Sequence, residues 1–229
     1  MKPAINDNKI VFFTGAGISA DSGLETFRSE GGLWDKMNVM DYASITGWQR
    51  DPQLVLDFFN DRRNRMLRAQ PNKAHLAISA LQEKYKVVVI TQNIDDLHER
   101  AGSQHVIHLH GDIVQGRSSK DKSMRFPLGT SGIALGDTCA DGSQIRPNIV
   151  WFGEEVEFME EAKRHLQEAA TVVAIGTSLA VQPAAGLLKY ARYKARKLLI
   201  TLDVGTRVPH GFKWMRARAS ECENLILSL

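Results

Sequence analysis

Cysteine is the residue that this sequence most clearly lacks, since its 229 residues include only Cys139 and Cys222. Two thiols cannot build a disulfide framework, and by themselves they cannot supply the four ligands of a structural zinc site. Long apolar runs are also missing: none exceeds the length of a strand, which argues against a membrane span. The first residues, Met1–Asp7, contain no apolar signal region, so we expect the protein to stay in the cytoplasm.

An excess of charge of one sign is lacking as well. The chain has 29 basic and 26 acidic residues, a formal net charge of +3, and the basic residues are spread along its length. This pattern does not predict a surface for nucleic acid. With 43% apolar and 24% charged residues, the composition is that of one large globular domain, or of one domain that carries a small insert.

Short apolar runs that alternate with helical patterns are what the sequence does contain. The runs predict buried strands over Ile10–Thr14, Val87–Ile90, Val106–Leu109, Ile149–Trp151, Val172–Ile175 and Leu198–Leu202. Apolar residues spaced three and four apart predict helices over Asn72–Lys84, Glu155–Ala170 and Pro183–Lys194. Strands that alternate with helices favour an α/β fold with a doubly wound, Rossmann-like parallel sheet.

Two stretches interrupt this alternation. Gly31–Gln70 contains no strand pattern but a long helical one over Pro52–Arg68, and Asp112–Arg146 is rich in Gly, Ser, Asp and Lys. Both resemble insertions that together form a smaller lobe. We therefore predict a Rossmann-like domain and an inserted lobe, the former over residues 1–30, 71–111 and 146–229 and the latter over 31–70 and 112–145.

A glycine-rich turn follows the first predicted strand. Gly15–Ala20 reads GAGISA and matches the dinucleotide pattern G-x-G-x-x-G/A, in which Gly15 permits the turn and Gly17 lets the backbone approach a pyrophosphate held by exposed N–H groups. The acidic residue that normally ends the second strand is not found, because Asp35 and Asp41 have the spacing but end no strand. Either this is a turn without a ligand, or a dinucleotide binds differently from its arrangement in a dehydrogenase.

Polar residues also follow the second predicted strand, in Thr91–Asp96. Gln92, Asn93 and Asp95 can bind a carboxamide and a ribose at the carboxyl edge of a parallel sheet. The alternative is that Asn93 and Asp95 cap the helix that begins near Asp96.

Two further strand ends carry residues suited to ligands. His108 and His110 end the third predicted strand, and Gly176–Ser178 ends a later one. An imidazole, with an ordinary pKa near ~6.5, can take a proton from a ribose hydroxyl, although a structural histidine or a metal-binding pair with His108 are alternatives. Because four strand ends of this kind converge on one edge of a sheet, they predict a nucleotide site with His110 as its base.

These motifs resemble those of the sirtuins, the NAD-dependent protein-lysine deacylases. The matching segments are GAGISADSGLETFR at Gly15–Arg28, TQNIDDLHERAG at Thr91–Gly102, HLHG at His108–Gly111, RPNIVWFGE at Arg146–Glu154 and GTS at Gly176–Ser178. They lie in the family's order and span nearly the whole chain. The resemblance implies that NAD is consumed as a co-substrate and that the partners are proteins or peptides with acylated lysines.

The resemblance also implies roles for single residues. Catalysis would rest on His110 and Asn93. Asn93 and Gln92 would hold the nicotinamide ribose, while Ile94 and Asp95 would hold the carboxamide. The full expected NAD site comprises Gly15, Ala16, Gly17, Ala20, Thr26, Phe27, Arg28, Trp34, Gln92, Asn93, Ile94, Asp95, Gly176, Thr177, Ser178, Thr201 and Asp203.

The sirtuin reaction that the resemblance implies begins when the acyl oxygen attacks C1′ of the ribose and nicotinamide leaves. His110 would then activate a ribose hydroxyl that attacks the imidate carbon, and water would complete the release of lysine and O-acyl-ADP-ribose. Phe27 would cover the nicotinamide side. Val150, Trp151 and Phe152 would pair with the substrate backbone as an added strand. The expected substrate site comprises Phe59, Arg62, Val150, Trp151, Phe152 and Gly153.

The sequence departs from the family's zinc module. Sirtuins usually carry two Cys-x-x-Cys pairs between the HG and RP motifs, but here Gly116–Ser119 and Cys139–Gly142 stand in their places and Cys139 is the one cysteine of the interval. A tetrahedral thiolate site cannot form from one chain, so we predict no structural zinc. A site built from Asp residues is the alternative.

The acyl pocket and the adenosine site depart as well. One sirtuin subgroup carries Tyr-x-x-Arg, which pairs with acidic acyl groups such as succinyl, and this chain has Phe59 and Arg62 there. The guanidinium can bind a carboxylate, but the tyrosine hydroxyl is missing; alternatively Arg62 lies on an exposed helix face with Arg63 and Arg65. Thr201 replaces an Asn that contacts the adenosine ribose, and Asp203 would take over that contact.

Three functions compete on this sequence. The first is removal of acetyl, or also succinyl, groups from protein lysines; the second is NAD glycohydrolysis or ADP-ribosyl transfer at the same site. The third is a non-catalytic sensor of NAD or ADP-ribose. The sequence favours the first because His110, Asn93 and Asp95 are all present. It does not indicate an oligomeric state.

Overall fold

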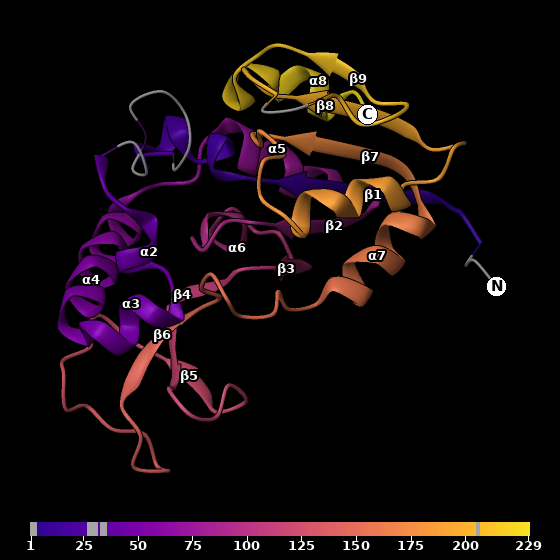
Figure 1. Ribbon diagram of the computed structural model, residues 1–229. Coiled ribbons are helices and arrows are strands. Elements are labelled where there is room, and N and C mark those ends of the chain that lie inside the picture. Colours follow the sequence, from indigo (N-terminus) through magenta and orange to yellow (C-terminus); the bar gives the residue numbers. More distant parts are fainter. Residues whose placement is uncertain (1–3, 27–31, 33–35, 205–206) are drawn as a thin grey trace.

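The computed structural model describes residues 4–26, 32, 36–204 and 207–229 (Figure 1). A six-stranded sheet with the order β3-β2-β1-β7-β8-β9 forms its centre, and every neighbouring pair in it is parallel. The predicted doubly wound parallel sheet is confirmed. Its strands are β1 (Asn6–Thr14), β2 (Lys86–Thr91), β3 (Val106–His108), β7 (Ala169–Ile175), β8 (Arg196–Ile200) and β9 (Lys213–Met215).

The order in which strands are added reverses between β1 and β7, although all the strands are parallel. From β1 the chain continues to β2 and β3 on one side, and it later returns to β7, β8 and β9 on the other. Such a switch point leaves a crevice beyond the carboxyl ends of the strands, where ligands of this fold class bind.

Helices cover both faces of the large sheet. On one face α7 (Met159–Glu168) and η4 (Ala184–Tyr190) pack on the strands, and on the other α5 (Lys73–Ala80), η3 (Leu81–Glu83), η5 (Ala219–Cys222) and α8 (Glu223–Leu227) do so. Asn72 caps α5 in a capping box with His75, and its amide also donates to the carbonyl of Ile18, at 2.7 Å. This cap thus joins α5 to the glycine-rich turn.

A second, smaller sheet is antiparallel and has the order β5-β4-β6. Its strands are β4 (Gly111–Ser118), β5 (Arg125–Pro127) and β6 (Ile145–Ile149). The strand predicted over Ile149–Trp151 as part of the large sheet is therefore wrong. Its first residue, Ile149, ends β6 of the small sheet and pairs with Gly111, while Val150 and Trp151 follow the strand.

The long helix α4 (Pro52–Arg68) stands against the small sheet, as Figure 1 shows, and its bounds are those predicted. Asp51 caps it by accepting from the amide of Leu54, and Pro52 occupies its first turn. Val55, Phe59 and other apolar residues of α4 share a core with Trp151. The division into a domain and an inserted lobe remains a prediction, and its boundary at residue 146 lies within β6.

The remaining elements are short. They are η1 (Ala16–Ile18), η2 (Ala20–Ser22), α2 (Val39–Tyr42), α3 (Ile45–Arg50) and α6 (Leu97–Arg100). Two predicted helices differ in detail, since α7 begins four residues later than Glu155 and η4 is a 3₁₀ helix. Among the described residues, no helix has the length and apolar character needed to cross a membrane.

Candidate active site

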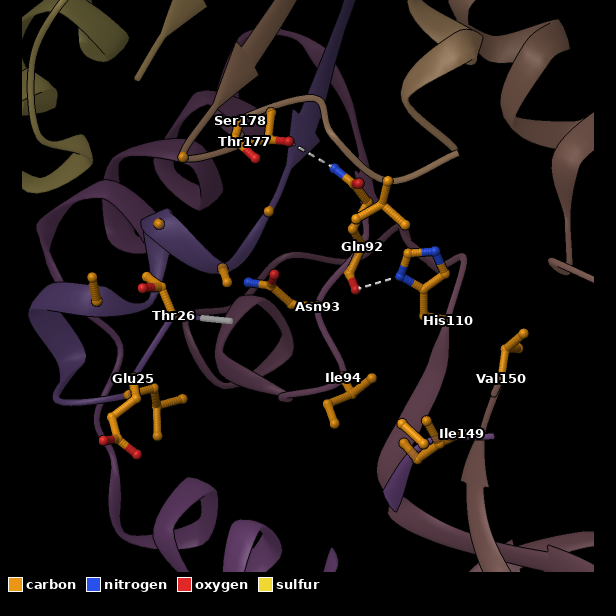
Figure 2. Close-up of a pocket in the computed structure, with 18 of the residues that line it drawn as sticks. Glu25, Thr26, Gln92, Asn93, Ile94, His110, Ile149, Val150, Thr177 and Ser178 are labelled. Carbon is orange, nitrogen blue, oxygen red and sulfur yellow. Dashed lines mark hydrogen bonds between the residues drawn. The ribbon is translucent and has the colours of Figure 1, made fainter. Parts of the chain in front are cut away.

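A cavity of about 600 Å³ lies beyond the carboxyl ends of the large sheet (Figure 2). Residues that follow β1, β2, β7 and β8 line one side, and residues of α4 and of the segment after β6 line the other. Its volume is within the usual range for a site that takes a cofactor-sized molecule. The lining combines amides and hydroxyls with apolar side chains, a mixture that fits a dinucleotide and an acyl chain.

Most of the predicted site residues meet in this cavity. Those that line it are Gly15, Ala16, Gly17, Ala20, Thr26, Phe59, Gln92, Asn93, Ile94, His110, Val150, Trp151, Phe152, Gly153, Gly176, Thr177, Ser178, Thr201 and Asp203. Asp95 and Arg62 line a smaller cavity beside it, together with Asn93 and Ile94. Phe27, Arg28 and Trp34 lie outside the described residues.

The glycine-rich turn is built differently from its predicted form. The amide of Gly17 donates to the carbonyl of Gly176 at 2.8 Å, and that of Ile18 donates to Gly15 at 3.0 Å. These N–H groups thus form hydrogen bonds within the protein. A Cβ at Gly17 would lie 2.8 Å from the Gly176 oxygen, so glycine is needed here for close contact between the ends of β1 and β7.

Gln92 connects three strand ends. Its side-chain amide donates to the hydroxyl of Thr177 at 3.0 Å and to the carbonyl of Thr14 at 3.3 Å. Its backbone carbonyl accepts from Nδ1 of His110 at 2.9 Å, as the dashed lines in Figure 2 show. One residue therefore sets the relative positions of the groups after β1, β3 and β7.

His110 has a defined tautomer as a result. A carbonyl oxygen can only accept, so Nδ1 of His110 carries the proton that it donates to Gln92. In the neutral imidazole Nε2 then holds the lone pair and is the nitrogen that can take a proton. His110 lines the cavity, so the geometry of a general base is present.

His108 has a different role. Its Nδ1 bonds to the carbonyl of Asn93 at 3.0 Å and its Nε2 lies 2.8 Å from Glu99. Burial disfavours the charged form, but the hydrogen bond and charge of Glu99 outweigh it and raise the pKa of His108 to about 9. His108 and Glu99 form an ion pair that fixes the loop of Asn93, so the alternative of a metal-binding pair with His110 is not supported.

This ion pair predicts a pH-dependent stability. The pKa of His108 is raised above its unfolded value near ~6.5, so its stabilisation is complete below pH ~6.5 and is lost as pH rises through about 9. Glu99→Gln should lower the free energy of unfolding by about 1–2 kcal/mol at pH 6. The expected loss is this small because the Glu99 side chain is 41% exposed and solvent screens the ion pair. Above pH ~10 the two proteins should be equally stable. Urea unfolding at several pH values tests this, and a pH-independent difference contradicts it.

Asn93 and Asp95 are linked through Ser19. The Asn93 amide donates to the Ser19 hydroxyl at 3.1 Å, and that hydroxyl donates to Asp95 at 3.0 Å. Asp95 also accepts from the amide of Leu97, so the capping interpretation applies to Asp95, whereas the Asn93 side chain is oriented by Ser19. Burial raises the pKa of Asp95 to about 6. The three side chains form one buried hydrogen-bonded unit between the glycine-rich turn and β2.

The segment predicted to receive the substrate backbone uses its amides elsewhere. The N–H of Val150 donates to the backbone carbonyl of His110 at 2.9 Å, and that of Phe152 donates to the carbonyl of Ala43 at 2.8 Å. The N–H of Trp151 donates to the carboxylate of Glu154 at 2.8 Å. Trp151 is buried and packs against Phe59, with ring centroids 6.2 Å apart. A substrate strand would therefore have to pair through other backbone groups at this wall of the cavity.

Arg62 is not on an exposed face. It is 3% exposed, its guanidinium lies 3.6 Å from the carboxylate of Glu25, and burial lowers its pKa. Arg63 is buried as well and donates to the backbone of residues 129–131, while Arg65 is the exposed member of the three. The exposed-face interpretation is wrong for Arg62 and Arg63.

Comparison with known proteins identifies this arrangement. The model of the Sir2 family matches residues 15–183, more than half of the chain. The chain belongs to the Sir2 family. A protein from Helicobacter pylori named NAD-dependent protein deacylase is 48% identical over 186 residues, which cover 81% of this chain and 79% of that protein. One of the same name from Bacteroides thetaiotaomicron is 45% identical over 93% of both chains.

Solved Sir2 structures have the same fold. A Sir2 homologue in complex with NAD is 34% identical, with a TM-score of 0.84 over 97% of this chain and 89% of that one. A Sir2 protein with a deacetylated p53 peptide and 3'-O-acetyl ADP ribose is 31% identical, with a TM-score of 0.81 over 97% and 94% of the two chains. The recognition of the family from its motifs is confirmed.

At the position of the usual Sir2 zinc module the chain has a cluster of hydroxyls and a carboxylate. Ser118 donates to one oxygen of Asp141 and Ser143 to the other, both at 2.7 Å, and the two hydroxyls lie 2.7 Å apart. The backbone amides of Lys120 and Asp121 donate to Ser118. These donors and acceptors pair with one another and, with Cys139 as the single thiol, do not fit a thiolate zinc site.

The sequence patterns did not predict several residues that line the cavity. Val181, Gln182 and Pro183 line the cavity, although the sequence pattern indicates only a helix that starts at Pro183. Glu154 accepts from Arg146 and Arg117 and from the amide of Trp151, and so holds this wall in place. The signal that could have found Glu154 is its place at the end of the RPNIVWFGE segment.

Proposed function

We propose that this Sir2 protein removes acyl groups from lysine side chains of proteins in a reaction that consumes NAD. The observation that carries the proposal is His110, fixed by Gln92 with Nε2 as its basic nitrogen, in the cavity at the switch point. Cleavage of the glycosidic bond of NAD, or binding of NAD alone, does not need a base placed in this way. We place this activity in the cytoplasm.

Different residues of the cavity contribute to different steps of the reaction. Bound NAD supplies an activated bond between nicotinamide and ribose. We expect Asn93, which Ser19 orients, to hold the nicotinamide ribose, and Thr177 and Asp203 to contact the adenosine half. His110 Nε2 takes the proton of a ribose hydroxyl, while the carbonyl of Gln92 stabilises the resulting imidazolium through Nδ1. The apolar wall with Phe59 keeps bulk water from the reacting groups.

Mass spectrometry of peptides incubated with the enzyme tests the function. An acetyl-lysine peptide and a succinyl-lysine peptide of the same sequence are each incubated with enzyme, with and without NAD. We expect deacylated peptide, nicotinamide and O-acyl-ADP-ribose in equal amounts, and only with NAD. Consumption of NAD without deacylated peptide would instead identify a glycohydrolase, and no consumption at all would contradict both enzymatic functions.

We further propose a preference for acetyl over succinyl. The ring of Phe59 lines the large cavity and offers no hydroxyl to an acyl carboxylate. Arg62 lines the smaller cavity and is paired with Glu25, so a succinyl group would have to compete with that carboxylate. A buried carboxylate without full pairing is costly, whereas a short neutral acyl group meets only apolar surface.

Phe59→Tyr is therefore expected to shift the preference toward succinyl. A new hydrogen bond to a charged group contributes about 1.5 kcal/mol, which corresponds to roughly a tenfold rise in the ratio of kcat/KM for succinyl over acetyl peptide. Phe58→Tyr is the matched control, because Phe58 lines the same cavity next to Phe59. Competition between the two peptides in one reaction measures the ratio. An equal shift in both variants contradicts the proposed role of Phe59.

A further inference from the structure

A second cluster of ligand-type side chains lies outside the described cavities. His105 immediately precedes β3, and Glu161 and His165 stand one turn apart on α7, so they share a face of that helix. His105 is at the amino end of the strand whose carboxyl end leads to His110. None of the three residues is among those that line either described cavity.

The three side chains bring their ligand atoms close together. Nε2 of His105 lies 3.9 Å from Oε1 of Glu161, and Nε2 of His165 lies 3.8 Å from the same oxygen. One ligand atom from each residue lies within 4.8 Å of the other two. Ligands about 2.1 Å from a tetrahedral zinc ion are about 3.4 Å apart, so a closing movement of roughly an ångström gives that geometry.

His165 is the unusual member of the cluster. It is 5% exposed, and neither of its ring nitrogens forms a hydrogen bond with the described residues. Buried polar atoms in folded proteins are nearly always paired, so such an imidazole indicates an absent partner.

The other two ligands can make the closing movement. His105 is 42% exposed and Glu161 is 38% exposed, while the backbone under His105 is held by a 2.9 Å hydrogen bond from Val89 to its carbonyl. Lys9 and Arg164 bring positive charge near His165, but Lys9 is paired with Glu168 at 2.5 Å. The carboxylate of Glu161 supplies the negative charge in the cluster itself.

We propose that His105, Glu161 and His165 form a binding site for a divalent transition-metal ion such as Zn²⁺. Two imidazoles and a carboxylate are a known zinc set that leaves a fourth position for water. The ion would join α7 to the edge strand β3, and so fasten a helix to the border of the large sheet. This proposed site is separate from the family's thiolate module, which lies between the HG and RP motifs.

Zinc titration of the metal-free protein tests the site. The untagged full chain is dialysed against a chelator and titrated with Zn²⁺ in competition with a chromophoric chelator, and native mass spectrometry counts the bound ions. We expect one equivalent, and a rise in Tm of roughly 5–10 °C at a 100-fold excess over Kd. His105→Asn and Glu161→Gln should each weaken binding by about tenfold or more.

Matched variants separate this site from other zinc binding. Glu160 is next to Glu161 on the same helix, and its side chain is 85% exposed. The Glu160→Gln variant should therefore bind zinc as the wild type does. His165 is left unchanged because its burial makes substitution a risk to folding. Bound Co²⁺ should show no sulfur-to-metal charge-transfer absorption, which a site at Cys139 would show.

Two results overturn the proposal. One is the absence of saturable zinc binding by the wild type, and the other is equal affinity of the wild type, His105→Asn and Glu161→Gln. Deacylation of an acetyl peptide is measured in the same samples and should be unchanged in Glu161→Gln. Failure of the metal site therefore leaves the proposed function untouched, and failure of the deacylase assay leaves the metal result valid.

Discussion

Replacing His110 by alanine is expected to slow deacylation by about 10²–10⁴-fold. The variant loses the nitrogen that takes the ribose proton, because Nε2 is the basic atom once Nδ1 donates to Gln92. Release of nicotinamide should be much less affected, since the attack of the acyl oxygen on the ribose requires no base. Deacylated peptide and nicotinamide are therefore measured in parallel from one reaction, in the first turnover and at steady state.

The control for this variant is His210→Ala, because His210 is exposed and does not line the cavity. It should retain full activity. Unfolding by urea shows whether His110→Ala is folded, and the carbonyl of Gln92 stays in place in both variants. Full deacylase activity of His110→Ala would falsify the assignment of the base, whereas an equal loss of nicotinamide release would assign His110 to binding.

Gly176→Ala is expected to lower the free energy of unfolding by about 3 kcal/mol or more and to weaken NAD binding. Gly176 has a φ of +66°, and a Cβ there would lie 2.2 Å from the amide nitrogen of Ile18. The backbone of the glycine-rich turn would have to move, and with it the hydrogen bond from Gly17 to Gly176. Urea unfolding and calorimetric titration with NAD measure the two effects.

Gly142→Ala separates the close contact from the backbone conformation. Gly142 has a similar φ of +73°, but among the described atoms nothing lies within 4 Å of its added Cβ. Its substitution should cost only the left-handed conformation, about 1–2 kcal/mol, and leave NAD binding unchanged. Equal losses of stability in the two variants would show that the contact between Gly17 and Gly176 is unimportant.

The sequence predicted those parts of the fold that depend on local patterns. The apolar runs gave β1, β2 and β7 to within a few residues, and the helical pattern over Pro52–Arg68 gave the bounds of α4. The convergence of the site could also be predicted, because parallel strands bring their carboxyl ends to one edge. His110 and Gln92 thus lie where strand order alone places them.

Features that depend on contacts between distant segments could not be predicted. The sequence of the glycine-rich turn is typical of a phosphate-binding loop, yet Gly17 uses its amide on Gly176, which is far away in sequence. The run Ile149–Trp151 has the composition of a buried strand in either sheet, and only its pairing with β4 decides between them. Likewise, a helical pattern does not reveal that Arg62 is buried and forms an ion pair with Glu25.

The cluster of Ser118, Asp141 and Ser143 has a consequence for the conditions under which the enzyme stays folded. A thiolate zinc module is opened by strong chelators and by oxidants, because both remove the ligands from the metal. Two hydroxyls and a carboxylate that hydrogen-bond one another offer neither kind of reagent a target. At this corner of the molecule, the hydrogen bonds therefore need no metal ion. Acid breaks them, since protonation of Asp141, whose pKa these hydrogen bonds lower to about 2, removes the acceptor.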